Sequence, residues 1–180
     1  MSKPFYFMRH GETDWNKNRI TMGQKDIPLN ETGILQAHAA AKVLQKEPIK
    51  HIVTSPLLRA RVTAEIVSRE LCAEMTIIED LKECAWGALE GCLKEDDFSK
   101  KWLSGEICDL AESFESLVVR ISGAFSQILA FDAPVLIVAH GGAYLALQKH
   151  LGIDSVRIKN CAPMYHAPHD YGCRWETRFL

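Results

Sequence analysis

The sequence of 180 residues lacks the features that mark membrane proteins and nucleic-acid-binding proteins. Its 21 basic and 23 acidic residues leave a net charge of −2, so composition gives no electrostatic reason to expect nucleic acid or a lipid surface as a partner. No stretch approaches the roughly 20 apolar residues of a membrane-spanning helix. The first apolar run also meets charged residues too early for a secretory signal. We therefore expect a cytoplasmic protein.

Cysteine pairs and nucleotide-binding fingerprints are missing as well. The six cysteines are scattered from position 72 to position 173, with no C-x-x-C pair among them. In a reducing compartment such cysteines are mostly buried small apolar residues, which argues against a disulfide framework and against a zinc site. Neither G-x-G-x-x-G nor G-x-x-x-x-G-K-[ST] occurs, so the usual glycine-rich phosphate loops are absent.

What the chain does contain is a regular alternation of short β-rich segments and longer helical ones. The spacing of apolar residues predicts strands at 4–9, 51–55, 75–80 and 133–140, and helices at 31–47, 57–71, 112–131 and 142–152. This order is typical of an α/β fold, a three-layer α/β/α sandwich with a mainly parallel sheet. We expect residues 1–180 to form a single domain, with an edge strand or a hairpin after residue 156.

Three segments carry more specific expectations. The run PVLIV within 133–140 has no polar alternation, so this strand should be covered on both faces of the sheet. Asn30 or Thr32 is the expected N-cap of the helix at 31–47. The predicted apolar positions of that helix are Ile34, Leu35, Ala39, Val43 and Leu44. Residues 84–111, with two tryptophans and mixed charge, look like a loop-rich flap over a site.

Polar residues follow three of the predicted strands at the point where each strand ends. They are Arg9, His10 and Gly11 after the first strand, Ser55 and Arg59 after the second, and His140, Gly141 and Gly142 after the last. Ligands of open α/β sheets bind beyond the carboxyl ends of the strands. If these strands are neighbours, two histidines and two arginines converge on one site. The helix that begins after the last strand adds an N-terminus that favours an anion.

The residue types that would converge there suit a phosphoryl group. The planar, permanently charged guanidinium groups of Arg9 and Arg59 match phosphate oxygens. A neutral histidine nitrogen can attack phosphorus, and a second histidine, if protonated, can stabilise charge on the equatorial oxygens. A leaving alkoxide also needs a proton donor, and a glutamate beside a bound dianion holds its proton more tightly than in water. Glu83 and Glu90 are both candidates, and spacing does not choose between them.

Simpler interpretations exist for several of these residues taken singly. A lone histidine after a strand is usually a packing or surface residue. The HGG at 140–142 also fits an esterase oxyanion hole, but the G-x-S-x-G elbow that such an enzyme needs is absent. His166 and His169 lack a further ligand at metal spacing, which favours a hairpin tip over a metal site. Burial is the commoner role for Trp86 and Trp102.

Six segments, in their order along the chain, resemble the histidine phosphatase superfamily, in the branch related to cofactor-dependent phosphoglycerate mutases. They are RHGETDWN (9–16), MGQKDIPLNETGILQA (22–37), SPLLRARVTA (55–64), ECAWGALEG (83–91), ESFESLVVRI (112–121) and VAHGG (138–142). RHG alone is a weak signal, whereas the six segments at these separations are specific. The resemblance implies a doubly wound, phosphoglycerate mutase-like α/β sheet with an added flap, and it implies neither a metal nor a cofactor.

The resemblance also implies roles for individual residues. His10 corresponds to the phospho-accepting nucleophile, and Arg9, Arg59 and His140 correspond to the rest of the phosphate pocket. Glu83, rather than Glu90, corresponds to the acid–base glutamate. The expected substrate contacts are Gly11, Asn16, Gly23 and Gly141.

Two departures from the family pattern bear on the expected activity. Many phosphatases of this branch carry glutamine where Met22 stands, and the mutases carry an Arg-Arg pair in a longer insertion that this chain lacks. We therefore expect a phosphomonoesterase for a small phosphorylated metabolite, with specificity set within 84–111. A mutase that returns the phosphoryl group to a sugar-acid phosphate is the first alternative. A phosphate-binding or interaction module without catalysis is the second.

Overall fold

The computed structural model describes residues 3–106, 111–132, 134–169 and 175–180. The strands are β1 (Phe5–Arg9), β2 (His51–Thr54), β3 (Glu74–Ile77), β4 (Val135–Ala139), β5 (Met164–Pro168) and β6 (Trp175–Phe179). The α-helices are α1 (Asp14–Lys17), α2 (Glu31–Leu44), α3 (Leu58–Leu71), α4 (Phe98–Leu103), α5 (Phe114–Ile128) and α6 (Gly141–Leu151). Two 3-10 turns, η1 (Glu79–Leu81) and η2 (Gly87–Leu89), lie between β3 and α4.

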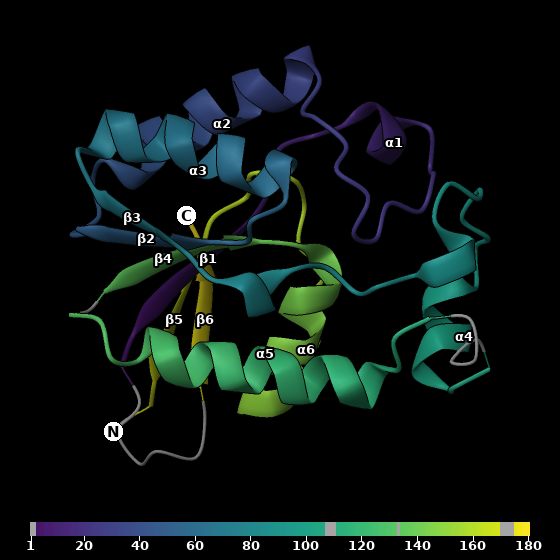
Figure 1. Ribbon diagram of the computed structural model, residues 1–180. Coiled ribbons are helices and arrows are strands. Elements are labelled where there is room, and N and C mark those ends of the chain that lie inside the picture. The colour runs from purple at the N-terminus through teal and green to yellow at the C-terminus, as the bar shows by residue number, and fades with distance from the viewer. Residues whose placement is uncertain (1–2, 107–110, 133, 170–174) are drawn as a thin grey trace.

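The six strands form one mixed sheet in the order β3-β2-β4-β1-β5-β6. The first four strands of that order are parallel, whereas β5 runs antiparallel to β1 and β6 antiparallel to β5. Helices α2 and α3 cover one face, and α5 and α6 cover the other (Figure 1). The predicted three-layer α/β fold with a mainly parallel sheet is therefore confirmed, as is the C-terminal hairpin. That residues 1–180 form a single domain stays a prediction.

The two faces of the sheet bury two separate hydrophobic cores, because successive side chains of a strand point to opposite faces. In β4, Val135 and Ile137 lie in the core beneath α5 and α6, whereas Leu136 and Val138 lie in the core beneath α2 and α3. All five residues of β4 are buried. The unbroken apolar run of this strand thus follows from its cover on both faces, as the sequence predicted.

Helix α2 buries a different face from the one that its large apolar residues predicted. Of the predicted apolar positions, Ile34, Leu35, Ala39 and Val43 are exposed, and only Leu44 is buried. The face turned to the core consists of small residues, Gly33, Ala37, Ala40 and Ala41. The alanines share a core with Tyr6 and Met8 of β1, and their short side chains let α2 lie close to the sheet. Asn30 is the N-cap, and its Oδ1 accepts a hydrogen bond from the Gly33 N–H.

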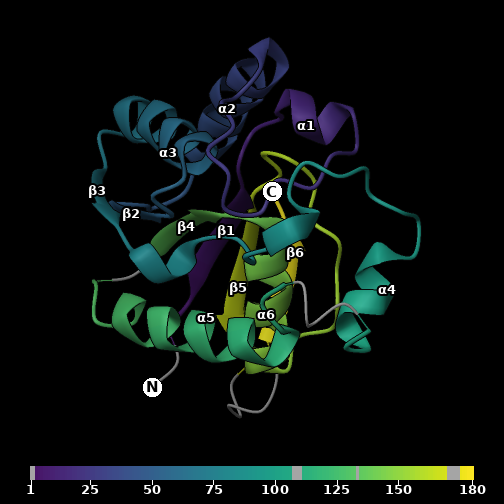
Figure 2. The same ribbon diagram turned by 45° about the vertical axis from the view of Figure 1, so that its right-hand side comes forward.

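The predicted flap is described up to residue 106 and again at residue 111. It contains η2 and α4, and Figure 2 shows α4 set apart from the sheet and its covering helices. The Trp86 ring meets Phe98 and Trp102 edge to face, with ring centroids 4.8 Å and 4.7 Å apart. Trp102 continues this contact to Phe114 of α5 at 5.1 Å. Aromatic packing therefore attaches the flap to the sandwich, and Trp86 and Trp102 are buried as predicted.

Two side-chain predictions are wrong in part. Cys84 and Cys161 are buried, but Cys72 and Cys92 are exposed; all four are free thiols, and the other two cysteines lie outside the described residues. His166 does not lie at the tip of the hairpin but is buried in β5, where its Nδ1 lies 3.0 Å from Thr177 Oγ1. The sheet position of residue 166, which points its side chain into the core, outweighs the local turn signal of the neighbouring proline.

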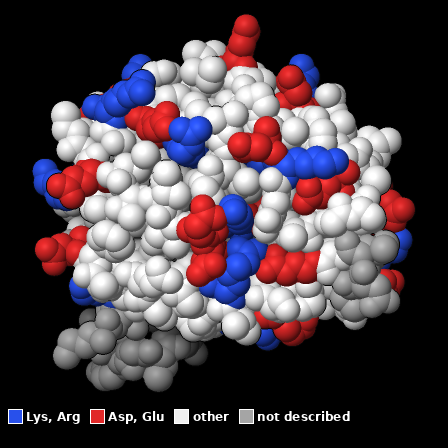
Figure 3. All heavy atoms as spheres, in the orientation of Figure 1, with Lys and Arg blue, Asp and Glu red and all other residues white. Residues whose placement is uncertain are grey.

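Charged side chains of both signs are interspersed over the face shown in Figure 3 rather than gathered by sign. Among the described residues, none of the helices combines the length and the apolarity that crossing a bilayer requires.

Candidate active site

The three strands that end in polar residues lie next to one another in the sheet. Strand β4 is flanked by β2 and β1, and the register pairs Arg9 with Ala139 and Thr54 with Val138. The carboxyl ends of the three strands are therefore level, so the residues that follow them meet at one edge. This adjacency is the condition on which the predicted convergence of histidines and arginines depended.

His10 follows β1 and is buried, with a defined tautomer. Its Nδ1 lies 2.7 Å from the carbonyl oxygen of Gly11, which can only accept, so Nδ1 carries the ring hydrogen. Arg59 Nε donates a hydrogen bond of 3.2 Å to His10 Nε2, which is therefore the unprotonated nitrogen. Burial, followed by the cations Arg59 and Arg9, holds the pKa of His10 well below its ordinary value. The ring is neutral at pH 7, with a lone pair on Nε2.

Arg59 is fully buried in the first turn of α3. Besides His10, its guanidinium donates to two backbone carbonyls of one loop, that of Gly23 at 2.7 Å and that of Lys25 at 2.9 Å. Burial is the main cause that lowers the pKa of Arg59, to about 10. The group therefore remains a cation at pH 7. The two carbonyl bonds fix its orientation, and its Nε–H points at His10 Nε2.

His140 and Arg9 complete the convergence, and each leaves a buried polar atom without a partner. The rings of His10 and His140 lie 5.2 Å apart between centroids. His140 Nε2 lies 2.8 Å from Ser55 Oγ, whereas His140 Nδ1 and Arg9 Nε have no hydrogen-bond partner among the described residues. Buried polar atoms of native proteins are rarely unpaired, so these two atoms indicate a place for a ligand with acceptor oxygens.

His140 is neutral in the free protein, unlike the protonated form considered from the sequence. Burial, followed by Arg59, His10 and Arg9, holds the pKa of His140 well below its ordinary value. A neutral ring can still donate: when the Ser55 hydroxyl donates to Nε2, the ring hydrogen lies on Nδ1.

Glu83 lies at the N-terminus of α6, the helix that begins after His140. Its Oε2 accepts a hydrogen bond of 3.0 Å from the Gly142 N–H, and its Oε1 accepts one of 2.9 Å from the Cys84 N–H. A Cβ at Gly142 would collide with the carboxylate of Glu83, so only glycine allows this approach. The anion-favouring amide of residue 142, which the sequence left open for a ligand, is therefore occupied by the carboxylate of this protein.

Glu90 has a different place and different partners. Its Oε1 accepts hydrogen bonds from the backbone N–H groups of Gln24, at 2.8 Å, and Trp86, at 3.3 Å. The Lys25 ammonium donates to its backbone carbonyl at 3.1 Å. Glu90 thus ties the flap to the loop whose carbonyls hold Arg59. Geometry separates the two glutamates that spacing left equivalent.

The remaining predicted residues lie around this centre. Gly11 donates its N–H to Thr63 Oγ1 at 3.0 Å, and a Cβ on Gly11 would collide with the carbonyl of Gly33, so α2 itself requires glycine there. Gly23 holds Arg59 through its carbonyl. A Cβ on Gly141 would lie 3.9 Å from Arg9 Nε. Direct contact of any of these glycines with substrate stays a prediction.

Asn16 takes part in the N-terminal cap of α1. Its N–H donates to Thr13 Oγ1 at 3.1 Å, and its Oδ1 accepts from the Thr13 N–H at 3.2 Å. Among the described residues, no hydrogen bond occupies its Nδ2 group. The side chain is thus oriented by the cap, and its predicted contact with phosphate is left to Nδ2. Met22, where glutamine was noted in relatives, is buried and accepts a hydrogen bond from Thr13 Oγ1 on its sulfur.

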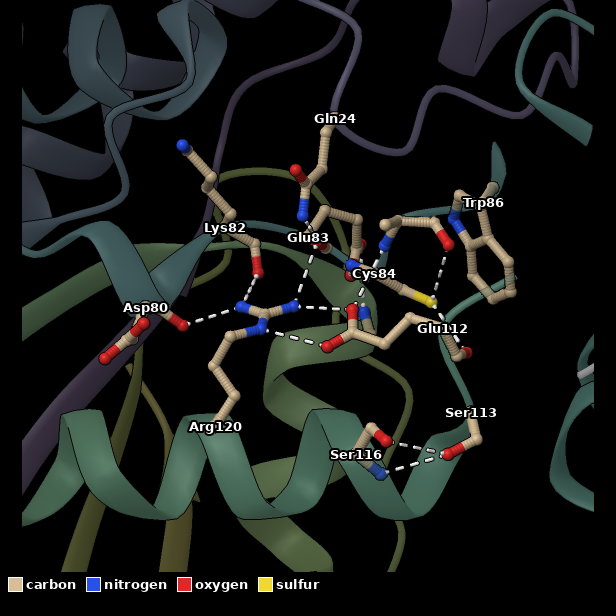
Figure 4. A network of polar contacts seen from close by, with 12 residues as sticks. Gln24, Asp80, Lys82, Glu83, Cys84, Trp86, Glu112, Ser113, Ser116 and Arg120 are labelled. Atoms are coloured by element: carbon tan, nitrogen blue, oxygen red, sulfur yellow. Dashed lines mark hydrogen bonds and ion pairs between the residues drawn. The ribbon is translucent and has the colours of Figure 1, made fainter. Parts of the chain in front are cut away.

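Sequence reasoning missed two residues that shape the site, Asn160 and Arg120, and the role of a third, Gly142. Asn160 donates from Nδ2 to the carbonyl of His10 at 2.8 Å and to Asn16 Oδ1 at 3.3 Å, and no local pattern marks it. Gly142 was quoted in HGG, but its partner Glu83 was not foreseen. Arg120 lies within ESFESLVVRI and binds the backbone beside Glu83, as Figure 4 shows.

The assembled groups can hold a tetrahedral dianion against a neutral imidazole nitrogen. Arg59 donates to His10 Nε2, and the ring of His140 lies 5.2 Å from that of His10. The Arg9 cation contributes to lowering the pKa of His10, and a carboxyl lies at the neighbouring helix terminus. Across the described ranges, no three or more His, Cys, Asp or Glu side chains are grouped to bind a metal ion.

The chain is similar in sequence and in fold to known proteins. The chain is 39% identical over 160 residues to "Uncharacterized phosphatase PhoE" of Bacillus subtilis, covering 85% of this chain and 82% of that protein. It is 35% identical over 175 residues to "Probable phosphoglycerate mutase GpmB" of Photorhabdus laumondii, covering 87% and 81%. A mycobacterial glucosyl-3-phosphoglycerate phosphatase in complex with VO3 superposes with a TM-score of 0.82 at 25% identity, covering 99% of this chain and 97% of that one.

The family model of the histidine phosphatase superfamily (branch 1) matches residues 5–167, which include every candidate site residue described above. The match spans both the strand-end residues and the glutamate segment. The chain therefore belongs to the histidine phosphatase superfamily.

Proposed function

We propose that this protein is a phosphomonoesterase that hydrolyses small phosphate esters through a phosphohistidine on His10, with Glu83 as general acid and base. One observation carries the proposal. His10 presents an unprotonated Nε2 to the Nε–H of Arg59, while the buried Arg9 Nε and His140 Nδ1 have no partners in the described structure. A phosphoryl group at this point satisfies the unpaired atoms and lies against the nucleophilic nitrogen.

In the first step the Nε2 lone pair of His10 forms a bond to phosphorus as the bond from phosphorus to the ester oxygen breaks. The departing alcohol oxygen takes a proton from the Glu83 carboxyl. The phosphorylated ring keeps its hydrogen on Nδ1 and so becomes positively charged. The carbonyl of Gly11, 2.7 Å from Nδ1, accepts a hydrogen bond from that N–H and so stabilises the positive charge.

In the second step a water oxygen attacks phosphorus, and the electron pair of the P–N bond returns to His10 Nε2. The Glu83 carboxylate takes the proton of that water and is ready for the next turnover. Arg9, Arg59 and the Nδ1–H of His140 hold the equatorial oxygens in both steps, where charge develops. Substrate binding exchanges the Arg59–His10 hydrogen bond for one from Arg59 to a phosphate oxygen.

The relatives support hydrolysis of a phosphate monoester but name different reactions. The names include a phosphatase, a glucosyl-3-phosphoglycerate phosphatase and a probable phosphoglycerate mutase. Residues 84–111, where we place substrate selection, contain no arginine. Of their lysines, Lys101 is engaged by Glu95 at 2.6 Å and by Asp97 at 3.3 Å. The absence of an arginine pair there favours a phosphatase over a mutase. We propose a small phosphorylated metabolite of the cytoplasm as the substrate.

The test is phosphate release from a panel of phosphate esters by the wild type, H10A and H38A. His38 is an exposed histidine paired with Glu70 on the outer helices, so H38A is the matched control. We expect H10A to lose activity on the order of 10⁴-fold. The wild type, quenched during turnover, should carry an acid-labile phosphoryl group that H10A lacks. Equal phosphate release by the wild type and H10A would contradict the proposal.

The same protein distinguishes the two alternatives. The 35% identity to a probable phosphoglycerate mutase is the observation that favours a mutase. If interconversion of phosphoglycerates with a bisphosphate primer outpaces phosphate release, the chain is a mutase. Tight binding of phosphate esters with no turnover across the panel would instead make it a binding module.

A further inference from the structure

Glu83 lies on a segment with little regular structure of its own. Between β3 and the flap, the chain makes only the short turn η1 before reaching Glu83. A backbone of this kind leaves carbonyl groups to be satisfied by side chains. The partner of these carbonyls is Arg120, which projects from the middle of α5 toward the segment (Figure 4).

Every N–H group of the Arg120 guanidinium has an acceptor. Nη1 donates to the carbonyls of Asp80, at 2.7 Å, and Lys82, at 2.8 Å. Nη2 donates to the carbonyl of Glu83 at 3.3 Å and to Glu112 Oε2 at 2.7 Å. Nε donates to Glu112 Oε1 at 3.0 Å. One side chain thus holds the backbone on which Glu83 is mounted.

Glu112 holds the chain directly after Glu83. Its Oε2 accepts from the Ala85 N–H at 3.1 Å, and its own N–H donates to the Ala85 carbonyl at 2.7 Å. Its carbonyl accepts from Trp102 Nε1 at 3.0 Å and from the Cys84 thiol at 3.4 Å. Arg120 and Glu112 are only 20% and 15% exposed, so water competes little for these bonds.

We propose that the Arg120–Glu112 pair is a positioning device for the acid–base step: it orients Glu83 toward the leaving-group oxygen without touching the substrate. The inference rests on the proposed function. None of the hydrogen bonds of Arg120 reaches His10, Arg9, Arg59 or His140. Filling space would need only apolar side chains, which are often as stable as a buried ion pair. The bidentate pair and its backbone bonds instead set the direction of one carboxyl, which meets the Gly142 amide.

The role predicts a dependence on the leaving group. Transfer from an alkyl phosphate needs the Glu83 proton, because an alkoxide is a poor leaving group. Transfer from p-nitrophenyl phosphate needs it little, because the phenolate leaves unprotonated. We compare kcat/KM, which reports the steps up to release of the first product, for glycerol phosphate and p-nitrophenyl phosphate.

We expect R120M to lower kcat/KM for glycerol phosphate about 100-fold and for p-nitrophenyl phosphate only a few-fold, since general acid catalysis is worth about 10² or more. R120K should recover part of the loss. In an E83Q background R120M should add no further loss, because the group that it positions is gone. R61M is the matched control: it breaks the Arg61–Glu65 pair of α3, which forms no hydrogen bond with residues 80–85 among the residues that the structure describes.

E112Q provides a second route if R120M does not fold. It keeps the shape and the three carbonyl bonds of Arg120 but removes the charge that holds the guanidinium, and it should show the same leaving-group dependence at about tenfold. Equal losses on both esters, or additive losses in E83Q, would overturn the inference while leaving the proposed function intact. H10A activity equal to the wild type would instead overturn the proposed function.

Discussion

The strand-end half of the site and the glutamate half are held in place by different interactions. His10 and His140 each directly follow a sheet strand, and Arg59 lies in the first turn of α3, so the register of the parallel strands places them. Glu83 depends on the side chains of Arg120 and Glu112 and on one amide of α6. A ladder of backbone bonds is insensitive to single substitutions of neighbouring side chains, whereas a side-chain clamp is not. We therefore expect substitutions outside the site to disturb proton transfer more than phosphate binding, and substitutions of the strand-end residues themselves to cost the most.

The largest effect should come from the strand-end half. R59M removes the cation beside His10 Nε2 and should lower kcat/KM about 10³-fold, since one preorganised donor is worth about 10² to 10³. Because this loss concerns the phosphoryl group itself, it should be the same for glycerol phosphate and p-nitrophenyl phosphate. It also leaves the carbonyls of Gly23 and Lys25 without their donor, which should cost roughly 2 kcal/mol of unfolding free energy. A loss confined to the alkyl ester would erase the distinction between the two halves.

G142A should disturb the glutamate half alone. The added Cβ takes the space of the Glu83 carboxylate, which must turn away and lose the amide of residue 142. We expect a loss of about 10² in kcat/KM on glycerol phosphate, with the inhibition constant of inorganic phosphate unchanged. G123A, at an exposed helical glycine with open space around it, is the control and should leave both values as they are. Weakened inhibition by phosphate in G142A would show that the halves are not separable.

Lowering the pH should reduce the unfolding free energy through the two histidines of the strand-end half. The pKa values of His10 and His140 are lowered in the folded protein, mainly by burial, so the unfolded chain takes up protons first as pH falls. The stability that depends on their neutral forms is complete above pH ~6.5 and is lost progressively below it, at about 1 kcal/mol for each imidazole by pH ~5.5. Urea unfolding at the two pH values measures this difference, and H10A should show a smaller one. Unfolding free energies that do not change between them would contradict the assignment.

The smallest effect should arise at the edge of the glutamate half. W102F keeps the aromatic packing of the flap but removes the Nε1–H that Glu112 accepts. We expect a loss of about 1 kcal/mol in unfolding free energy and a small decrease in kcat/KM that is confined to the alkyl ester. W175F is the control for the loss of an indole. Trp175 lies in β6, at the opposite edge of the sheet from β3, the strand that precedes the glutamate segment. An equal decrease in activity for W175F would mean that the Glu112 contact does not matter.

Local patterns in the sequence predicted the layers and most of the strand-end residues. Strand and helix periods depend on neighbours within a few positions, so PVLIV and the polar residues that follow each strand could be recognised directly. The buried face of α2 could not be recognised in the same way. Alanines at 37, 40 and 41 lie in the core, and larger residues such as Leu35 face solvent, because close approach to the sheet outweighs side-chain size.

The sequence by itself determined where strands end and which charged and imidazole groups stand there, because each of these facts is local. Tertiary structure decided that β4 lies between β2 and β1 and that Glu83, not Glu90, reaches α6. It alone assigned Asn160 to the carbonyl of His10 across 150 positions, and Arg120 to the backbone of Glu83 across 37. Such bonds join chemically ordinary side chains to backbone groups far away in the chain. The spacing of residues along the sequence does not predict such bonds, because the two partners meet only after the layers have packed.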